Sequence, residues 1–175
     1  MNLSEPVFTG LSAAFVIGVL ALLTFESPYG VWLMFSFGSS ALILFVFYDS
    51  EFARPKNVFF GHLISIIIGI SFNHFIGISF ISLGLSVGLC VTLMMYFKII
   101  HPPAAANPLI ALFADVSYDF VLFPVMSGSV VLIVLAYLIN TFILGRKITV
   151  EKSNSKVQSK RLKLKRKKTK KNKAA

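Results

Sequence analysis

Five stretches of this sequence are apolar over about 20 residues, the length that a helix needs to cross a lipid bilayer. The chain is 56% hydrophobic and contains 18 Phe, which is too apolar for an ordinary soluble domain of 175 residues. We therefore predict an all-α, polytopic transmembrane bundle with four or five full spans plus one or two interrupted or half helices. The five windows are Val7–Phe25, Pro28–Tyr48, Asn57–Phe72, Ile76–Phe97 and Phe120–Gly145.

Charge divides the chain into two parts. Residues 1–145 contain three basic residues and six acids, and each acid lies in a predicted loop or at a helix edge, as expected because a charge at the bilayer midplane is costly. Residues 146–175 contain fourteen Lys or Arg and one acid. We predict a membrane domain over 1–145 and a disordered, basic tail over 146–175 on the cytoplasmic side.

The tail has two interpretations. A basic segment beside a membrane can bind anionic lipid head groups, or it can be a solvated anchor that only fixes topology. Nucleic acid is not an expected partner, because the membrane body keeps the tail next to lipid.

Small residues recur at four-residue spacing within three of the windows. Such spacing lets helix backbones approach closely in lipid. We expect these faces to pack inside the bundle, and the alternative is that one of them joins two copies in a homo-oligomer. The three sets are Gly10, Ala14 and Gly18; Gly61, Ser65 and Gly69; and Gly84 and Gly88.

The segment KIIHPPAAANP, residues 98–108, interrupts the apolar sequence. Pro102 and Pro103 cannot continue a helix, because they lack N–H donors, but proline is favoured in the first turn of a new one. A helix is therefore expected to restart near Ala104 and to run to Ala114. Its length of about 16 Å covers about half of the hydrocarbon core. Irregular backbone at that depth must be buried in protein or line a wet cavity.

The second window has a similar interruption at Phe37-Gly38-Ser39-Ser40, followed by another short apolar helix. Paired interrupted segments in two halves of a chain, as in an inverted repeat, typify the binding sites of transporters. The start of a half-helix presents N–H groups and a positive dipole end, which favour an anion. We predict that the two tips meet near the midplane and bind a small anion through Gly38, Ser39, Ser40, His101, Pro102, Pro103 and Asn107.

Three motifs in order resemble those of the HPP family of integral membrane proteins. His101-Pro102-Pro103 matches the motif that names the family, and 37–41 matches its Phe-Gly-Ala-Ser-Ala type stretch. Residues 53–62 match its Ala-x-Pro-x-Asn stretch that ends in Gly-His. The resemblance covers about residues 7–145 and implies four transmembrane helices. Some members are linked to nitrite transport, which makes nitrite the leading candidate. The sequence Ala104-Ala105-Ala106-Asn107 departs from the Gly and hydroxyl residue usual after His-Pro-Pro.

The same stretch supplies candidate pathway residues. Arg54 can draw anions to a cavity mouth or anchor the helix at the head groups, and Asn57 and His62 follow it on one predicted span. The three histidines have no recognisable metal-ligand spacing, so we predict no metal and no cofactor. The acids lie in separate loops, and no nucleophile has an adjacent base, so we do not expect an enzyme. Convergence of His101, Asp115 and Asp119 at one membrane face would change that expectation.

The sequence thus favours a transporter or channel for a small inorganic anion. The alternative is a structural or sensory membrane subunit that works through its basic tail. Topology stays open, because four crossings place both termini on the same side and five place them on opposite sides.

Overall fold

The computed structural model describes residues 4–28 and 31–146, and its regular structure in that part is entirely helical, as predicted. Six α-helices are joined in places by short 3-10 turns, η1 and η2, and the last span also contains two π-helical turns, η3 and η4. In chain order the elements are α1 (Ser4–Glu26), α2 (Ser36–Val46), η1 (Glu51–Ala53), α3 (Pro55–Phe75), α4 (Phe80–Tyr96), η2 (Pro102–Ala106), α5 (Asn107–Ala114), η3 (Val121–Met126), α6 (Ser127–Leu138) and η4 (Ile139–Ile143).

Three helices among the described residues are long and apolar enough to cross a membrane, namely Ser4–Glu26, Pro55–Phe75 and Val121–Ile143. Three shorter apolar helices, Ser36–Val46, Phe80–Tyr96 and Pro102–Ala114, accompany them. The total of four or five full spans stays a prediction. The third window is longer than expected, because Pro55 begins the helix at a position where its missing N–H is not needed. The last span is interrupted at Phe123, which has extended backbone angles directly before Pro124.

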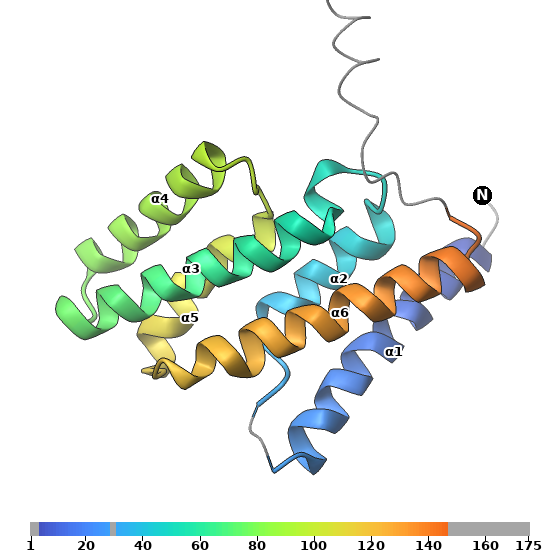
Figure 1. Cartoon of the computed structure of the whole chain (residues 1–175), viewed down its shortest axis with the longest axis horizontal. Coiled ribbons are helices and arrows are strands. Elements are labelled where there is room, and N and C mark those ends of the chain that lie inside the picture. Colours follow the sequence, from blue (N-terminus) through green and yellow to red (C-terminus); the bar gives the residue numbers. More distant parts are fainter. Residues whose placement is uncertain (1–3, 29–30, 147–175) are drawn as a thin grey trace, which may run out of the picture.

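Helix α3 lies at the centre of the bundle and contacts α4, α5 and α6 (Figure 1). Helix α1 lies at the outside and packs against α2 and α6. The Arg146 guanidinium, which follows the last span, donates to the Glu5 carboxylate at 3.2 Å and to the Thr9 hydroxyl at 2.9 Å in α1. The beginning of α1 and the end of the last span therefore lie at the same end of the bundle.

The two interrupted segments run in opposite directions from a shared starting point beside the middle of α3. Helix α2 begins at this point and leads towards the end of the bundle where α3 begins. Helix α5 also begins there but leads towards the end of α3, where Asn73 Nδ2 donates to the Asp115 carboxylate at 2.7 Å. Asp115 has a left-handed backbone conformation and ends α5.

The extended residues before α2 are fixed by α1. The Thr24 hydroxyl accepts hydrogen bonds from the backbone N–H groups of Trp32 and Leu33, each at 3.0 Å. Since unpaired backbone donors are costly within a bilayer, this side chain stabilises an irregular segment that leads into the bundle.

The small-residue faces are only partly as predicted. A Cβ on Gly69 would lie 2.6 Å from the Pro108 Cα, so α3 and α5 approach as closely as backbones can. By contrast, Cβ atoms on Gly10, Gly18, Gly84 and Gly88 would meet no described atom within 4 Å. The expectation that these two faces pack inside the bundle is therefore wrong. Helices α1 and α4 bury other faces, which carry Ser12, Val16 and Leu20 in α1 and Ser82, Ser86, Cys90 and Met94 in α4.

Arg146 belongs to the bundle and not to the tail that was predicted to begin with it. Its guanidinium donates to the Phe45 carbonyl at 2.7 Å and lies 4.8 Å from the centre of the Tyr48 ring. Asn140 Nδ2 donates to the neighbouring Leu44 carbonyl at 3.1 Å. Together these side chains satisfy carbonyls at the end of α2. The prediction of a disordered tail otherwise concerns residues 147–175, which lie outside the described residues.

Candidate functional site

The starts of the two half-helices are joined directly by a side-chain hydrogen bond. The Ser36 hydroxyl, in the first turn of α2, donates to Asn107 Oδ1, at the start of α5, over 2.8 Å. Both residues are buried, and Asn107 also contacts Ser65, which is close to the midpoint of α3. The structure thus brings the two predicted tips together at mid-height in the bundle.

Asn107 connects this junction to α3. Its amide nitrogen donates to His62 Nδ1 at 2.9 Å and to the Ser65 hydroxyl at 2.8 Å. The Ser65 hydroxyl in turn donates to the His62 carbonyl at 2.9 Å. Asn107, His62 and Ser65 are completely buried, so their polar atoms depend on one another and not on water.

The Ser40 hydroxyl lies between two imidazole rings. It is 2.9 Å from His62 Nε2 and 2.9 Å from His101 Nε2, and the ring centres are 4.9 Å apart. His101 Nδ1 is 2.8 Å from the carbonyl oxygen of Phe52, which follows the first residue of η1. Ser40 and both histidines are completely buried.

One arrangement of protons satisfies all of these contacts with neutral rings. Because a carbonyl only accepts, His101 Nδ1 carries a proton and His101 Nε2 accepts from the Ser40 hydroxyl, which shares its one proton with the Ser36 carbonyl at 3.0 Å. Because the Asn107 amide nitrogen only donates, His62 Nδ1 accepts and His62 Nε2 donates to Ser40. Hydrogen bonds therefore point in one direction from Asn107 through His62 and Ser40 to His101 and the Phe52 carbonyl.

Glycine at position 61 allows the rings to meet. A Cβ on Gly61 would lie 2.9 Å from the His101 Cβ and 3.4 Å from the Ile99 carbonyl oxygen. The segment that leads to His101 is fixed by Asn57, whose amide donates to the Ile100 carbonyl at 3.2 Å and to the Glu51 carbonyl at 2.9 Å. Irregular backbone at residues 99–101 is thereby enclosed by protein, as predicted for a break within a membrane.

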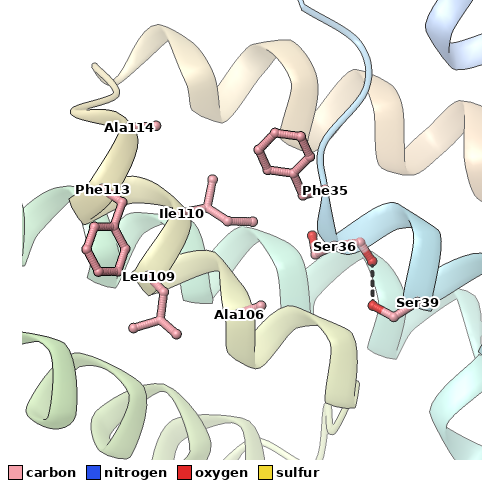
Figure 2. Close-up of a pocket in the computed structure, with 8 residues that line it drawn as sticks. All are labelled: Phe35, Ser36, Ser39, Ala106, Leu109, Ile110, Phe113 and Ala114. Carbon is pink, nitrogen blue, oxygen red and sulfur yellow. Dashed lines mark hydrogen bonds between the residues drawn. The ribbon is translucent and has the colours of Figure 1, made fainter.

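A groove opens beside the junction of the two tips (Figure 2). Its volume is about 640 Å³. The Ser39 side chain is exposed at one edge, and its hydroxyl donates to the Ser36 carbonyl at 2.9 Å. Most of the remaining wall is apolar, so any preference for charge has to come from the helix starts and the two serines. The groove is lined by Phe35, Ser36, Ser39, Ala106, Leu109, Ile110, Phe113 and Ala114.

The predicted binding residues divide into two groups. Ser40, His101 and Asn107 are engaged with one another or with His62 and do not line the groove. Ser39 faces the groove, Gly38 is exposed one residue before it, and Pro102 and Pro103 form the first turn of η2. The role of all seven in binding an anion stays a prediction.

Backbone N–H groups at the two tips are also partly engaged. Those of Phe37 and Gly38 donate to the carbonyls of Met34 and Phe35, at 2.9 and 3.3 Å. That of Ala104 donates to the His101 carbonyl at 3.0 Å. The positive ends of the helices remain, but a ligand has to share these donors with the local turns.

The predicted pathway residues lie on the first part of α3. Arg54 immediately precedes the helix, is partly buried, and has an Nε with no hydrogen-bond partner. Asn57 lies one turn further along, and its amide donates to the backbone carbonyls of Glu51 and Ile100. His62 faces neither lipid nor the groove but the neighbouring rings.

Two members of the network were not predicted, namely Ser36 and Ser65. Ser36 lies four residues before Ser40 on α2, so the two hydroxyls share a helix face. Ser65 was assigned only to a small-residue face, three residues after His62. The sequence contains one signal that could have identified them: each is a serine three or four residues from a predicted site residue and therefore on the same helix face.

The arrangement that would indicate an enzyme is not found. His101 lies beside the first half of α3, whereas Asp115 contacts Asn73 near the other end of that helix. Asp119 is exposed in the segment before η3. Within residues 4–28 and 31–146, no three His, Cys, Asp or Glu side chains are placed to hold a metal ion.

Each of the three sequence motifs contributes one side chain to the same point, Ser40 from the first, His62 from the second and His101 from the third. The family described as HPP, transmembrane region, matches residues 1–149. The chain belongs to the HPP family. It is an integral membrane protein, as this family and its apolar helices show.

Two relatives of this HPP protein, both from Dictyostelium discoideum, are named only as transmembrane proteins. One is 29% identical over 160 residues, which cover 85% of this chain and 51% of the relative. The other is 28% identical over 152 residues, which cover 81% of this chain and 53% of the relative. The chain thus spans about half the length of these curated relatives. No solved structure matches it.

Proposed function

We propose that this HPP protein transports a small inorganic anion across the membrane, with nitrite as the leading candidate. The observation that carries the proposal is the meeting of two half-helix starts, at Ser36 and Asn107, beside the midpoint of α3. Nitrite is favoured because the motifs are those of a family in which some members are linked to nitrite transport. The C-terminal tail is proposed to lie on the cytoplasmic side.

Helices α2 and α5 run in opposite directions away from their shared starting point. Each start presents the positive end of its helix dipole to the same region, so two partial positive charges add there. An anion in the groove would contact the exposed Ser39 hydroxyl and lie next to the Ser36–Asn107 bond. Such a site attracts an anion without a permanently buried charge, which would be costly in a membrane.

The same geometry supports an inverted repeat. Two half-helices that start at one point and end towards opposite faces are the arrangement expected when two halves of a transporter are related by an axis in the membrane plane. In this proposal α2 and α5 are the corresponding elements, and the first and second halves of the chain supply one each.

Flux into liposomes tests the proposal. Purified protein is reconstituted, and uptake of nitrite, nitrate, chloride and formate is compared with that of protein-free liposomes, because nitrous acid crosses lipid unaided. We expect protein-dependent uptake of at least one of these anions. The variant Ser39→Leu, which fills the groove edge, should lower the rate about tenfold or more, whereas Ser71→Leu, at a half-buried position of α3 that does not line the groove, should not.

A structural or sensory subunit is the second candidate, favoured by one observation. The buried polar groups at the junction are satisfied by one another, as a scaffold requires. This alternative predicts no flux of any small anion from folded protein. It also predicts that removal of residues 151–175 abolishes the cellular function, whereas a transporter should largely retain its activity.

A further inference from the structure

We infer that His62, Ser40 and His101 form a proton-binding relay that takes up one proton when the anion enters the adjacent groove. The inference rests on the proposed function for the identity of the solute. It concerns the buried rings, which the anion proposal itself does not need, and it predicts movement of protons together with the anion.

The first support is the geometry of the three groups. The Ser40 hydroxyl is within 2.9 Å of a ring nitrogen on either side, and the rings come from different elements. A hydroxyl that accepts from one imidazole and donates to another can pass a proton between them, and here it needs only to rotate its O–H from the Ser36 carbonyl, 3.0 Å away, to His101. No other described pair of imidazoles has a bridging hydroxyl; His74 lies in the last turn of α3, beside Phe75.

The second support is the surroundings of the relay. Among the described residues, its hydrogen-bond partners are all neutral groups from α2, α3, α5 and η1: Ser36, Ser65, Asn107, and backbone carbonyls that include that of Phe52. The charged residues closest to the relay along the chain are Glu51, Arg54, Lys56 and Lys98. Within the described part of the chain, none of their side chains hydrogen-bonds to the network, and the Nε of Arg54 has no partner. A proton on either ring would therefore be an uncompensated charge until an anion arrives nearby.

The third support is the link between the relay and the groove. Ser36 lines the groove and donates to Asn107, which donates to His62 Nδ1. If an anion accepts the hydrogen bond of the Ser36 hydroxyl, the side-chain oxygen Oδ1 of Asn107 loses its donor. The amide can then turn away from His62 and expose the nitrogen that accepts a proton.

The proton balance is simple. One proton adds to Nδ1 of His62, which becomes an imidazolium. Its Nε2 proton passes to the Ser40 oxygen while the Ser40 hydroxyl proton passes to Nε2 of His101, so that the added charge is shared by two rings. Release of a proton from Nδ1 of His62, after the reverse shift, restores the starting state. The anion and the proton together form a neutral pair, which lowers the cost of crossing the membrane.

Two measurements on the same liposomes separate this inference from the proposed function. The first is exchange of labelled nitrite at equal pH and equal nitrite concentration on both sides, which needs no net proton movement. The second is the change of internal pH driven by an inward nitrite gradient, with the signal of protein-free liposomes subtracted. We expect exchange and coupled proton uptake in the natural chain.

The variants are chosen to keep the fold. His62→Gln retains an N–H that can donate to Ser40 but cannot carry a proton, and Ser40→Ala removes the bridge. Both should lower coupled proton uptake about tenfold or more. Ser86→Ala is the matched control, because Ser86 is equally buried and donates only within α4, to the Leu83 carbonyl. Elution profiles and melting curves in detergent confirm that each variant is folded.

Each outcome decides one of the two claims. The relay is overturned, and the proposed function stays in place, if the natural chain exchanges nitrite but shows no proton uptake under a nitrite gradient. Full proton uptake by both folded variants has the same meaning. Absence of nitrite exchange contradicts the proposed substrate. In that case proton uptake driven by inward gradients of nitrate, chloride and formate tests the relay with other anions, and equal uptake in the natural chain and Ser40→Ala overturns it.

Discussion

Helices α3 and α1 are both long enough to cross a membrane, yet they meet their neighbours in different ways. In the most apolar window of α3, 44% of the residues are buried inside the bundle, compared with 17% in α1. Helix α3 approaches α5 at backbone distance through Gly69 and carries two residues of the buried polar network. Helix α1 packs through one residue per turn and is fixed at its start by Arg146. Polar groups therefore sit where packing is closest, and the loosely packed helix is held by contacts at its ends.

The largest expected effect is at the α3–α5 contact. Gly69→Leu places a side chain where even a Cβ would lie 2.6 Å from Pro108 Cα and 2.7 Å from Ala111 Cβ. Since backbone cannot yield as a flexible side chain can, we expect loss of folded, monodisperse protein. Gly18→Leu in α1, where a Cβ meets nothing within 4 Å, should behave as the natural chain in size-exclusion chromatography. Equal behaviour of the two variants would contradict the comparison.

The next effect is at the polar junction. Asn107→Ala removes the side-chain amide that hydrogen-bonds to Ser36, His62 and Ser65. These three residues are buried, so water cannot replace the lost bonds. An unsatisfied buried group costs about 1–3 kcal/mol, so a clear fall in the melting temperature in detergent is expected. Ser12→Ala in α1, which loses only a bond to the Phe8 carbonyl, is the control and should change the melting temperature little. Similar losses in both variants would show that the network does not stabilise the fold.

A smaller effect is expected at the end of the bundle. Arg146→Met keeps a long apolar stem but removes the donors to the Phe45 carbonyl and to α1. Hydrogen bonds to charged groups contribute about 1.5–3 kcal/mol, and some of this is recovered by water at the membrane surface. We expect a modest fall in melting temperature and faster proteolysis at the start of α1. Unchanged proteolysis would mean that α1 is held by its apolar contacts alone.

The smallest effect concerns the exposed ion pair within that contact. Glu5 is 76% exposed, and its carboxylate is 3.2 Å from the Arg146 guanidinium. Pairs of this kind contribute about 0–1 kcal/mol and are screened by salt. Glu5→Gln should shift the melting temperature slightly at low salt and not at all at high salt. A large shift that persists in high salt would show that this ion pair stabilises the fold, which contradicts the small contribution expected of it.

The sequence predicted the two interruptions well, because proline, glycine and small polar residues leave a clear signal within apolar windows. It also predicted that the tips meet. It did not predict that Ser40, His62 and His101 meet through one hydroxyl, because that contact depends on how α2 and η2 pack against α3. The spacing of small residues was equally regular in α1, α3 and α4, and only tertiary packing distinguishes the face of α3 that is used.

Arg146 shows a second limit of sequence reasoning. As the first of fourteen basic residues it belongs by composition to the tail, but in space it lies between α1, α2 and the last span. Its role depends on the carbonyls at the end of a half-helix, and these are free only because α2 ends within the protein. A pattern along the chain cannot show which cation is near such an end.

The central claim is that two half-helix starts create a site for a small anion, and exchange of nitrite is its most direct test. Liposomes that contain the protein are loaded with unlabelled nitrite and placed in an equal concentration of nitrogen-15 nitrite at the same pH. We expect entry of label well above that of protein-free liposomes, and a tenfold or greater loss of this entry in Ser39→Leu. Entry no faster than through bare lipid, from protein shown to be folded, would contradict it.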